Sequence, residues 1–147
     1  MKELESLFAA LIERLKKLKI ADLPAVSIDG LYINGTLPVR TSAVYFLRSE
    51  SPSAPFKGGE NRARPGTKRN GILYIGKATD LRQRWNTQII TQPSGMKYEV
   101  QVHQKLKEAI ALGDVRLHWW AVDKPCLAIA ESLLIQLHRP PWNNHIY

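Results

Sequence analysis

The sequence predicts a mixed α/β fold of the α+β type, in which a small, mainly antiparallel, three-stranded central sheet is flanked by helices. Two patterns predict it. Short stretches rich in apolar, β-branched and aromatic residues predict strands at 43–47, 72–75 and 115–122. Helical spacing of apolar residues, capping residues and helix terminators predict helices at 3–19, about 79–90, 97–112 and 125–138. The chain has 147 residues, which suits one compact domain.

The first 40 residues are interpreted as an extension that packs on this domain. They begin with an amphipathic helix over 3–19, whose apolar side chains recur at helical spacing. The pair Asn34-Gly35 lies between apolar residues and predicts the turn of a β-hairpin within 30–39. The apolar face of the helix either packs on the domain, which is the interpretation we favour, or forms a dimer contact.

The main domain covers residues 41–147 and contains a long insertion at 49–70, rich in proline, glycine and basic residues. Loops of this length inside a domain are usually functional or disordered. The insertion carries five of the cations that we expect to contact nucleic acid, and a sixth lies on the following helix: Lys57, Arg62, Arg64, Lys68, Arg69 and Arg82.

Composition narrows the function. A net charge of +8 favours binding to polyanions, because bound phosphates release condensed counterions, although many basic proteins bind no nucleic acid. The single cysteine, Cys126, excludes an internal disulfide and fits a reducing compartment. The chain has no apolar run of about 20 residues and no secretory signal, so we expect a cytoplasmic protein with no membrane association.

One acidic residue stands out in the last predicted helix. Apolar side chains occupy nearly the whole circumference of 127–137, which predicts a buried helix, and Glu131 lies in its middle. A buried carboxylate is costly unless it is paired or binds a metal. A structural ion pair with a lysine or arginine is therefore one interpretation, and a metal site is the other. Asn143, which follows a Pro-Pro turn, can return toward Glu131.

A second group of polar residues begins on the strand at 72–75. Tyr74 alternates with apolar neighbours, Gly76 allows a close backbone approach, and Lys77 follows at once. On the next helix Arg84 comes one turn after Asp80. The ordinary interpretation of Arg84 is an ion pair with Asp80 on a solvated face.

These residues together resemble the GIY-YIG endonuclease family. The sequence Tyr74-Ile75-Gly76-Lys77-Ala78, followed by Leu81 and Arg84, is similar to the second half of the family signature, and Ala43-Val44-Tyr45 is similar to the first. Glu131, followed by a proline and by Asn143, resembles its closing motif. The resemblance spans about 42–144. The closest motif match is the nuclease domain of the bacterial excision-repair endonuclease, whereas the long insertion resembles restriction-type members.

The resemblance implies a metal-dependent endonuclease that hydrolyses phosphodiester bonds in DNA. It implies that Glu131 holds one Mg²⁺ ion (or Mn²⁺), because one carboxylate, waters and phosphate oxygens suit this cation. Arg84 is expected to bind the scissile phosphate. Lys77 would bind phosphate as well or help to activate a tyrosine. A homodimer would supply two active sites for double-strand cleavage.

The remaining roles that the resemblance implies are less specific. Tyr45 is the preferred general base, Tyr74 an orienting hydrogen-bond partner, and Asn143 a residue that orders the site around the glutamate. Gln88 departs from the family pattern, which has histidine or tyrosine there, and an amide cannot act as a base near neutral pH. His103 is a candidate to compensate, although an ordinary helix-surface histidine is the alternative.

Two other functions remain open at this point. The first is a nucleic-acid-binding module of the same fold with impaired catalysis, which Gln88 motivates. The second is an unrelated basic α/β protein in which Glu131 and Arg84 form a structural pair. Retention of the whole set of motif residues argues against mere binding.

Overall fold

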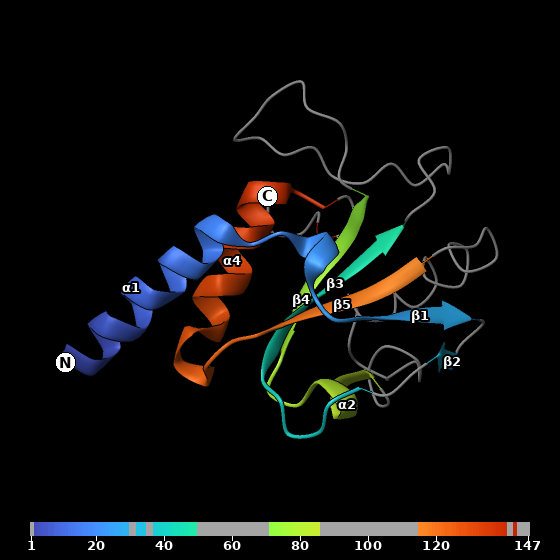
Figure 1. Ribbon diagram of the computed structural model, residues 1–147, viewed down its shortest axis with the longest axis horizontal. Helices are drawn as coiled ribbons and strands as arrows, with labels where there is room; N and C mark the ends of the chain where they lie inside the picture. Colours follow the sequence, from blue (N-terminus) through green and yellow to red (C-terminus); the bar gives the residue numbers. More distant parts are fainter. Residues whose placement is uncertain are drawn as a thin grey trace.

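A five-stranded antiparallel sheet organises the chain (Figure 1). The computed structural model describes residues 2–29, 32–34, 37–49, 71–85, 115–140 and 143. The sheet has the strand order β2-β1-β5-β3-β4, so that β2 and β4 are its edges. The strands have these bounds: β1 Ala25–Asp29, β2 Tyr32–Asn34, β3 Ala43–Ser49, β4 Ile72–Ala78 and β5 Val115–Ala121. The predicted fold class is confirmed.

The three predicted central strands are β3, β4 and β5, and β3 lies between the other two. Alternation along β3 sends Tyr45 and Leu47 to one face of the sheet and Val44 and Phe46 to the other. All four side chains are fully buried, because helices cover both faces. The sheet therefore separates two apolar clusters rather than facing water on one side.

Helices from the two ends of the chain cover the face of Val44 and Phe46. They are α1, Lys2–Lys17, and α4, Leu127–His138, which lie close together in Figure 1. Leu11 of α1 is buried in this cluster, and Arg14 donates a hydrogen bond of 2.8 Å to the carbonyl of Ala121. Two short 3-10 helices, η1 (Ile20–Asp22) and η3 (Lys124–Cys126), complete the connections.

The opposite face is covered near the end of β4 by α2, Leu81–Arg84, and by Trp85, which follows it. Asp80 caps α2, since its side chain accepts a hydrogen bond of 3.2 Å from the backbone N–H of Gln83. No helix of the described segments is long and apolar enough to cross a membrane.

The predicted position of the hairpin turn was wrong. Asn34 is the last residue of β2 and pairs with Ser27 of β1, so the chain reverses between Asp29 and Tyr32 rather than at Asn34-Gly35. The alternating residues of β1 point into the core, where Val26 and Ile28 are buried, and this face fixes the register. β1 also pairs with β5, so the hairpin extends the central sheet from three strands to five.

The prediction that α4 is buried all round was also wrong. Its buried residues are Leu127, Ala130, Leu134 and Ile135, which share one face, whereas Ile129 is 43% exposed. The helix ends at Arg139, whose backbone is left-handed at φ +44° and whose N–H donates a hydrogen bond to Ile135. The basic insertion beyond Ser49 and the predicted helix at 97–112 lie outside the described residues.

Candidate active site

A cavity of about 360 Å³ opens where β4 ends and the chain turns into α2. Its wall consists of Lys77, Ala78, Thr79 and Asp80 from this turn, Gln83 and Arg84 from α2, and Leu127 from α4. Because α2 and α4 cover opposite faces of the sheet, they can meet only around the edge strand β4. The cavity thus brings together residues that are about 50 positions apart in the sequence.

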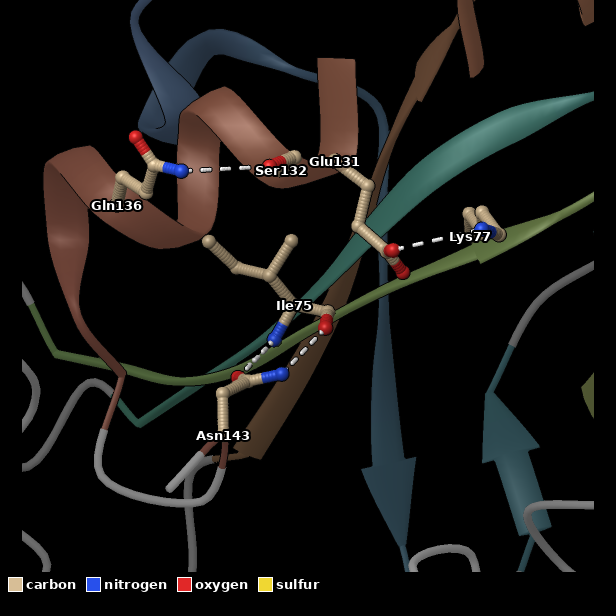
Figure 2. A network of polar contacts seen from close by, with 6 residues as sticks. All are labelled: Ile75, Lys77, Glu131, Ser132, Gln136 and Asn143. Carbon is tan, nitrogen blue, oxygen red and sulfur yellow. Dashed lines mark hydrogen bonds and ion pairs between the residues drawn. The ribbon is translucent and has the colours of Figure 1, made fainter. Parts of the chain in front are cut away.

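Glu131, on α4, contacts the wall of this cavity through Lys77. It lies one turn after Leu127, and Figure 2 shows its carboxylate directed at Lys77 of β4. The Glu131 Oε1 to Lys77 Nζ distance is 3.7 Å, and the two side chains are 19% and 47% exposed. The contact is a long ion pair, and Lys77 can move away from it because nearly half of its side chain lies in solvent.

The charge of Glu131 is poorly stabilised by its surroundings. Burial raises the pKa of the carboxyl above its ordinary value of 4.5, and the positive charges of Lys77 and Arg84 oppose this shift without cancelling it. An ion pair that served stability would lower the pKa of a glutamate. Lys77 and Arg84 therefore leave the negative charge of the carboxylate incompletely compensated, so a further cation beside it would stabilise its ionised form. This pattern is more typical of a functional site than of a structural pair.

Arg84 approaches the same carboxylate from the opposite face of the sheet. Its backbone N–H bonds to the carbonyl of Asp80, its side chain is half-buried, and its charge acts on Glu131. The carboxylate of Asp80 is meanwhile engaged in capping α2. The positive charge of Arg84 therefore acts on Glu131 from α2.

Asn143 binds the backbone of the edge strand β4 and does not line the cavity. Its Oδ1 accepts a hydrogen bond of 2.9 Å from the N–H of Ile75, and its Nδ2 donates one of 2.8 Å to the Ile75 carbonyl (Figure 2). The side chain is 1% exposed. A single amide thus satisfies both outward backbone groups of a residue on the edge strand of the described sheet.

The two tyrosines lie on the other face of the sheet from α4. Tyr45 and Tyr74 belong to the apolar cluster with Leu81 and Trp85, and their ring centroids are 6.1 Å apart. Tyr45 extends from β3 across β4, so that a Cβ added to Gly76 would overlap its ring and its hydroxyl group. Gly76 is therefore the position that leaves room for the end of the buried Tyr45 side chain over β4.

Of the predicted nucleic-acid contacts, only Arg82 is described. Its guanidinium donates hydrogen bonds through Nε and Nη2 to the carbonyl of Leu37, which fixes the segment before β3. Its DNA contact stays a prediction. The other five predicted contacts lie outside the described residues, and so do Gln88 and His103. These five contacts are Lys57, Arg62, Arg64, Lys68 and Arg69.

Sequence reasoning missed two wall residues of the cavity, Thr79 and Gln83. Both are exposed and polar, and both belong to the first turn after β4. A signal was available, because side chains at the start of a helix that follows a catalytic strand commonly face a bound anion. Gln83 can donate from its amide to a phosphate oxygen.

The site fits a single divalent cation held by one carboxylate. Among the described residues there is no group of three or more His, Cys, Asp or Glu side chains that could form a complete protein cage. Mg²⁺ needs no such cage, since it keeps waters and shares substrate phosphates. The described site has a carboxylate of this kind, Glu131, next to a cavity wall that carries two cationic side chains, Lys77 and Arg84.

The five-stranded antiparallel sheet, with helices over its faces and the candidate site at its edge strand β4, is a fold that is also found in a solved structure. A solved structure of a mutant of bacteriophage T4 EndoII has this fold, with a TM-score of 0.53 and 16% sequence identity over 90% of this chain and 98% of that chain. No family model and no curated protein matches the sequence. The similarity confirms the predicted fold.

Proposed function

We propose that the protein is a metal-dependent endonuclease that hydrolyses phosphodiester bonds of DNA at the GIY-YIG-type site around Glu131. One observation carries the proposal: a half-buried glutamate, whose pKa is raised by burial, pairs with Lys77 of the cavity wall, and the charge of Arg84 in the same wall acts on it. Three further motif residues, Tyr45, Gly76 and Asn143, contact the same strand or pack across it. A structural ion pair would need only two of these residues.

The residues divide the work of the reaction between them. Arg84 and Lys77 bind and neutralise the oxygens of the scissile phosphate. Glu131 holds Mg²⁺ (or Mn²⁺), which when bound supplies Lewis-acid stabilisation of the charge that develops on those oxygens. Tyr45, the preferred proton acceptor, extends over β4 at Gly76, and Tyr74 packs against it and orients it. Asn143 keeps β4 in place.

The experiment compares Glu131→Gln with a matched control, Glu13→Gln. Glu13 is also a helical glutamate in an ion pair with a lysine, but it is 65% exposed and lies on α1. Nicking of supercoiled plasmid in Mg²⁺ or Mn²⁺ should fall at least about 100-fold in Glu131→Gln, because a metal ligand is lost. Glu13→Gln should cleave like the wild-type protein.

Two further measurements separate metal binding from DNA binding. Mg²⁺ should raise the melting temperature of the wild-type protein and leave that of Glu131→Gln unchanged, since a ligand stabilises only the state that binds it. DNA affinity without divalent cations should be similar in both proteins. Unchanged cleavage by Glu131→Gln would remove this residue as the ligand, and a wild-type protein that binds but never nicks DNA would leave a binding module.

A further inference from the structure

A second cavity, of about 430 Å³, opens at the same end of the sheet as the active-site cavity. Two arginines line it, Arg14 from α1 and Arg40 from the turn before β3, together with the backbone segments 41–42 and 121–122 and with Asp123. Its charged side chains comprise two cations and one anion. The cavity therefore favours an anionic ligand, held on the side of the arginines.

Arg14 is fixed in position before any ligand arrives. Its Nη2 donates a hydrogen bond of 2.8 Å to the Ala121 carbonyl, and its guanidinium carbon lies 5.0 Å from the centre of the Trp120 ring. A guanidinium has five N–H donors, and stacking on an aromatic ring leaves those at its edge available. A donor group that is held in place loses little conformational freedom when it binds an anion.

Arg40 is unusual for a different reason. Its backbone is left-handed at φ +52°, a conformation that glycine adopts without strain and that other residues rarely adopt. Its side chain is exposed and makes no hydrogen bond or ion pair with the described parts of the chain. The other arginine with positive φ, Arg139, ends α4, which accounts for its conformation. What Arg40 contributes at its position is an exposed positive charge at the cavity.

The two cavities are neighbours across one strand. Ala43, at the start of β3, pairs with Ala78 at the end of β4 and with Ala121 at the end of β5. The residues just before it, Thr41 and Ser42, line the second cavity and bond to both neighbouring segments: the Thr41 carbonyl accepts a hydrogen bond from the N–H of Leu81 in α2, and Ser42 bonds to Val122 after β5. With adjacent strands about 4.8 Å apart, β4 and β5 are about 10 Å apart.

We infer that Arg40 and Arg14 bind a backbone phosphate of the same DNA strand whose scissile phosphate lies at Arg84 and Lys77. This inference rests on the proposed function. One strand of B-DNA carries a phosphate about every 3.4 Å along the helix axis, so a strand bound at one cavity has further backbone phosphates within a few nucleotides that can reach the other cavity. The second cavity thus fixes the register of the strand and performs no chemistry itself.

The test uses Arg40→Gly, with Arg139→Gly as its matched control. Both variants lose one positive charge and place glycine at a positive φ, where it relieves backbone strain, so neither is expected to lose its fold. Arg139 lies at the far end of α4, a helix of 12 residues and about 18 Å, from the cavities. Both changes are made in the Glu131→Gln protein. Binding of a short DNA duplex is followed by fluorescence anisotropy from about 50 to about 200 mM salt, a range in which the affinity of phosphate contacts changes strongly.

Affinity falls with salt, so the plot of log affinity against log salt has a negative slope. Arg40→Gly should make this slope less steep by about 0.9, the value for one phosphate contact, and should weaken binding several-fold. Arg40→Lys should keep the slope, because it keeps the charge. Arg139→Gly should leave both unchanged. Equal slopes in Arg40→Gly and its control, with melting temperatures preserved, would overturn the inference. That result would leave the proposed function intact, because the function is tested by a separate measurement, plasmid nicking by proteins that keep Glu131.

Discussion

Glu131 and Asn143 lie against the same strand, β4, yet their surroundings are opposite. Both polar atoms of Asn143 bond to the backbone of Ile75, at 2.8 and 2.9 Å, and the side chain is buried. Glu131 has one long contact of 3.7 Å to Lys77 and a pKa raised by burial. The polar groups of Asn143 are satisfied by the fold and the carboxylate of Glu131 is not, which is the difference we expect between a structural residue and the functional residue that we propose Glu131 to be.

Three consecutive residues of β4 contact the other elements of the candidate site. Ile75 bonds to Asn143, Gly76 accommodates the end of Tyr45, and Lys77 pairs with Glu131. Each residue of this segment therefore meets one other element of the site: the C-terminal segment, β3 and α4. The edge strand is the common support, and the comparison can be tested by disturbing its partners one at a time.

The largest effect on stability is expected from Asn143→Ala. The substitution removes two buried hydrogen bonds and leaves the N–H and the carbonyl of Ile75 without these partners, at a cost of about 2–4 kcal/mol in the free energy of unfolding. Urea denaturation measures this loss. Cleavage should fall in parallel with the folded fraction, whereas a large loss of cleavage in a fully folded protein would place Asn143 among the reacting groups.

A smaller effect is expected from Gly76→Ala. The new methyl group would overlap the buried ring of Tyr45, and overpacking of this kind costs about 1–3 kcal/mol. In the double variant with Tyr45→Ala the overlap is absent, so the cost of Gly76→Ala should largely disappear, and a double-mutant cycle measures this coupling. Additive losses would show that Gly76 is required for a reason other than Tyr45.

Tyr45→Phe and Tyr74→Phe test the two tyrosines without disturbing their packing, because each change removes only a hydroxyl group. If Tyr45 accepts the proton, its variant should lose about 100-fold or more in the cleavage rate, and Tyr74→Phe should lose less. Both proteins should keep their DNA affinity. The opposite order of the two losses would exchange the assigned roles.

The sequence predicted the elements that have a strong local signal. The strands at β3, β4 and β5 are short apolar stretches between turn residues, and the cap of α2 is an Asp at the residue before the helix, so each follows from local chemistry. The turn of the hairpin did not follow, because two glycine turns compete in 29–35 and only the pairing of β1 with β5 selects one.

The site was predictable by residue but not by geometry. The family resemblance selected Glu131, Lys77, Arg84 and Asn143, and the structure brings the first three together. That Asn143 serves the sheet edge instead of the carboxylate depends on which backbone groups of β4 point outward, which is a property of the assembled sheet. The exposed face of α4 was missed because a helical apolar pattern does not show how many neighbours a helix will have.

The smallest predicted effect discriminates most directly between Glu131 as a functional and as a structural residue. Because burial raises its pKa in the folded protein, the folded state binds the carboxyl proton more tightly than the unfolded chain does. The ionised carboxylate therefore opposes folding at neutral pH, and this opposition disappears as the pH falls below the unfolded value of 4.5. At a pH of roughly 7–8 the wild-type carboxyl is ionised, so Glu131→Gln should raise the melting temperature slightly. Below the ordinary pKa of 4.5 the substitution should leave the melting temperature unchanged. A lower melting temperature at neutral pH would mean that the pair with Lys77 stabilises the fold, and Glu131 would then resemble Asn143 after all.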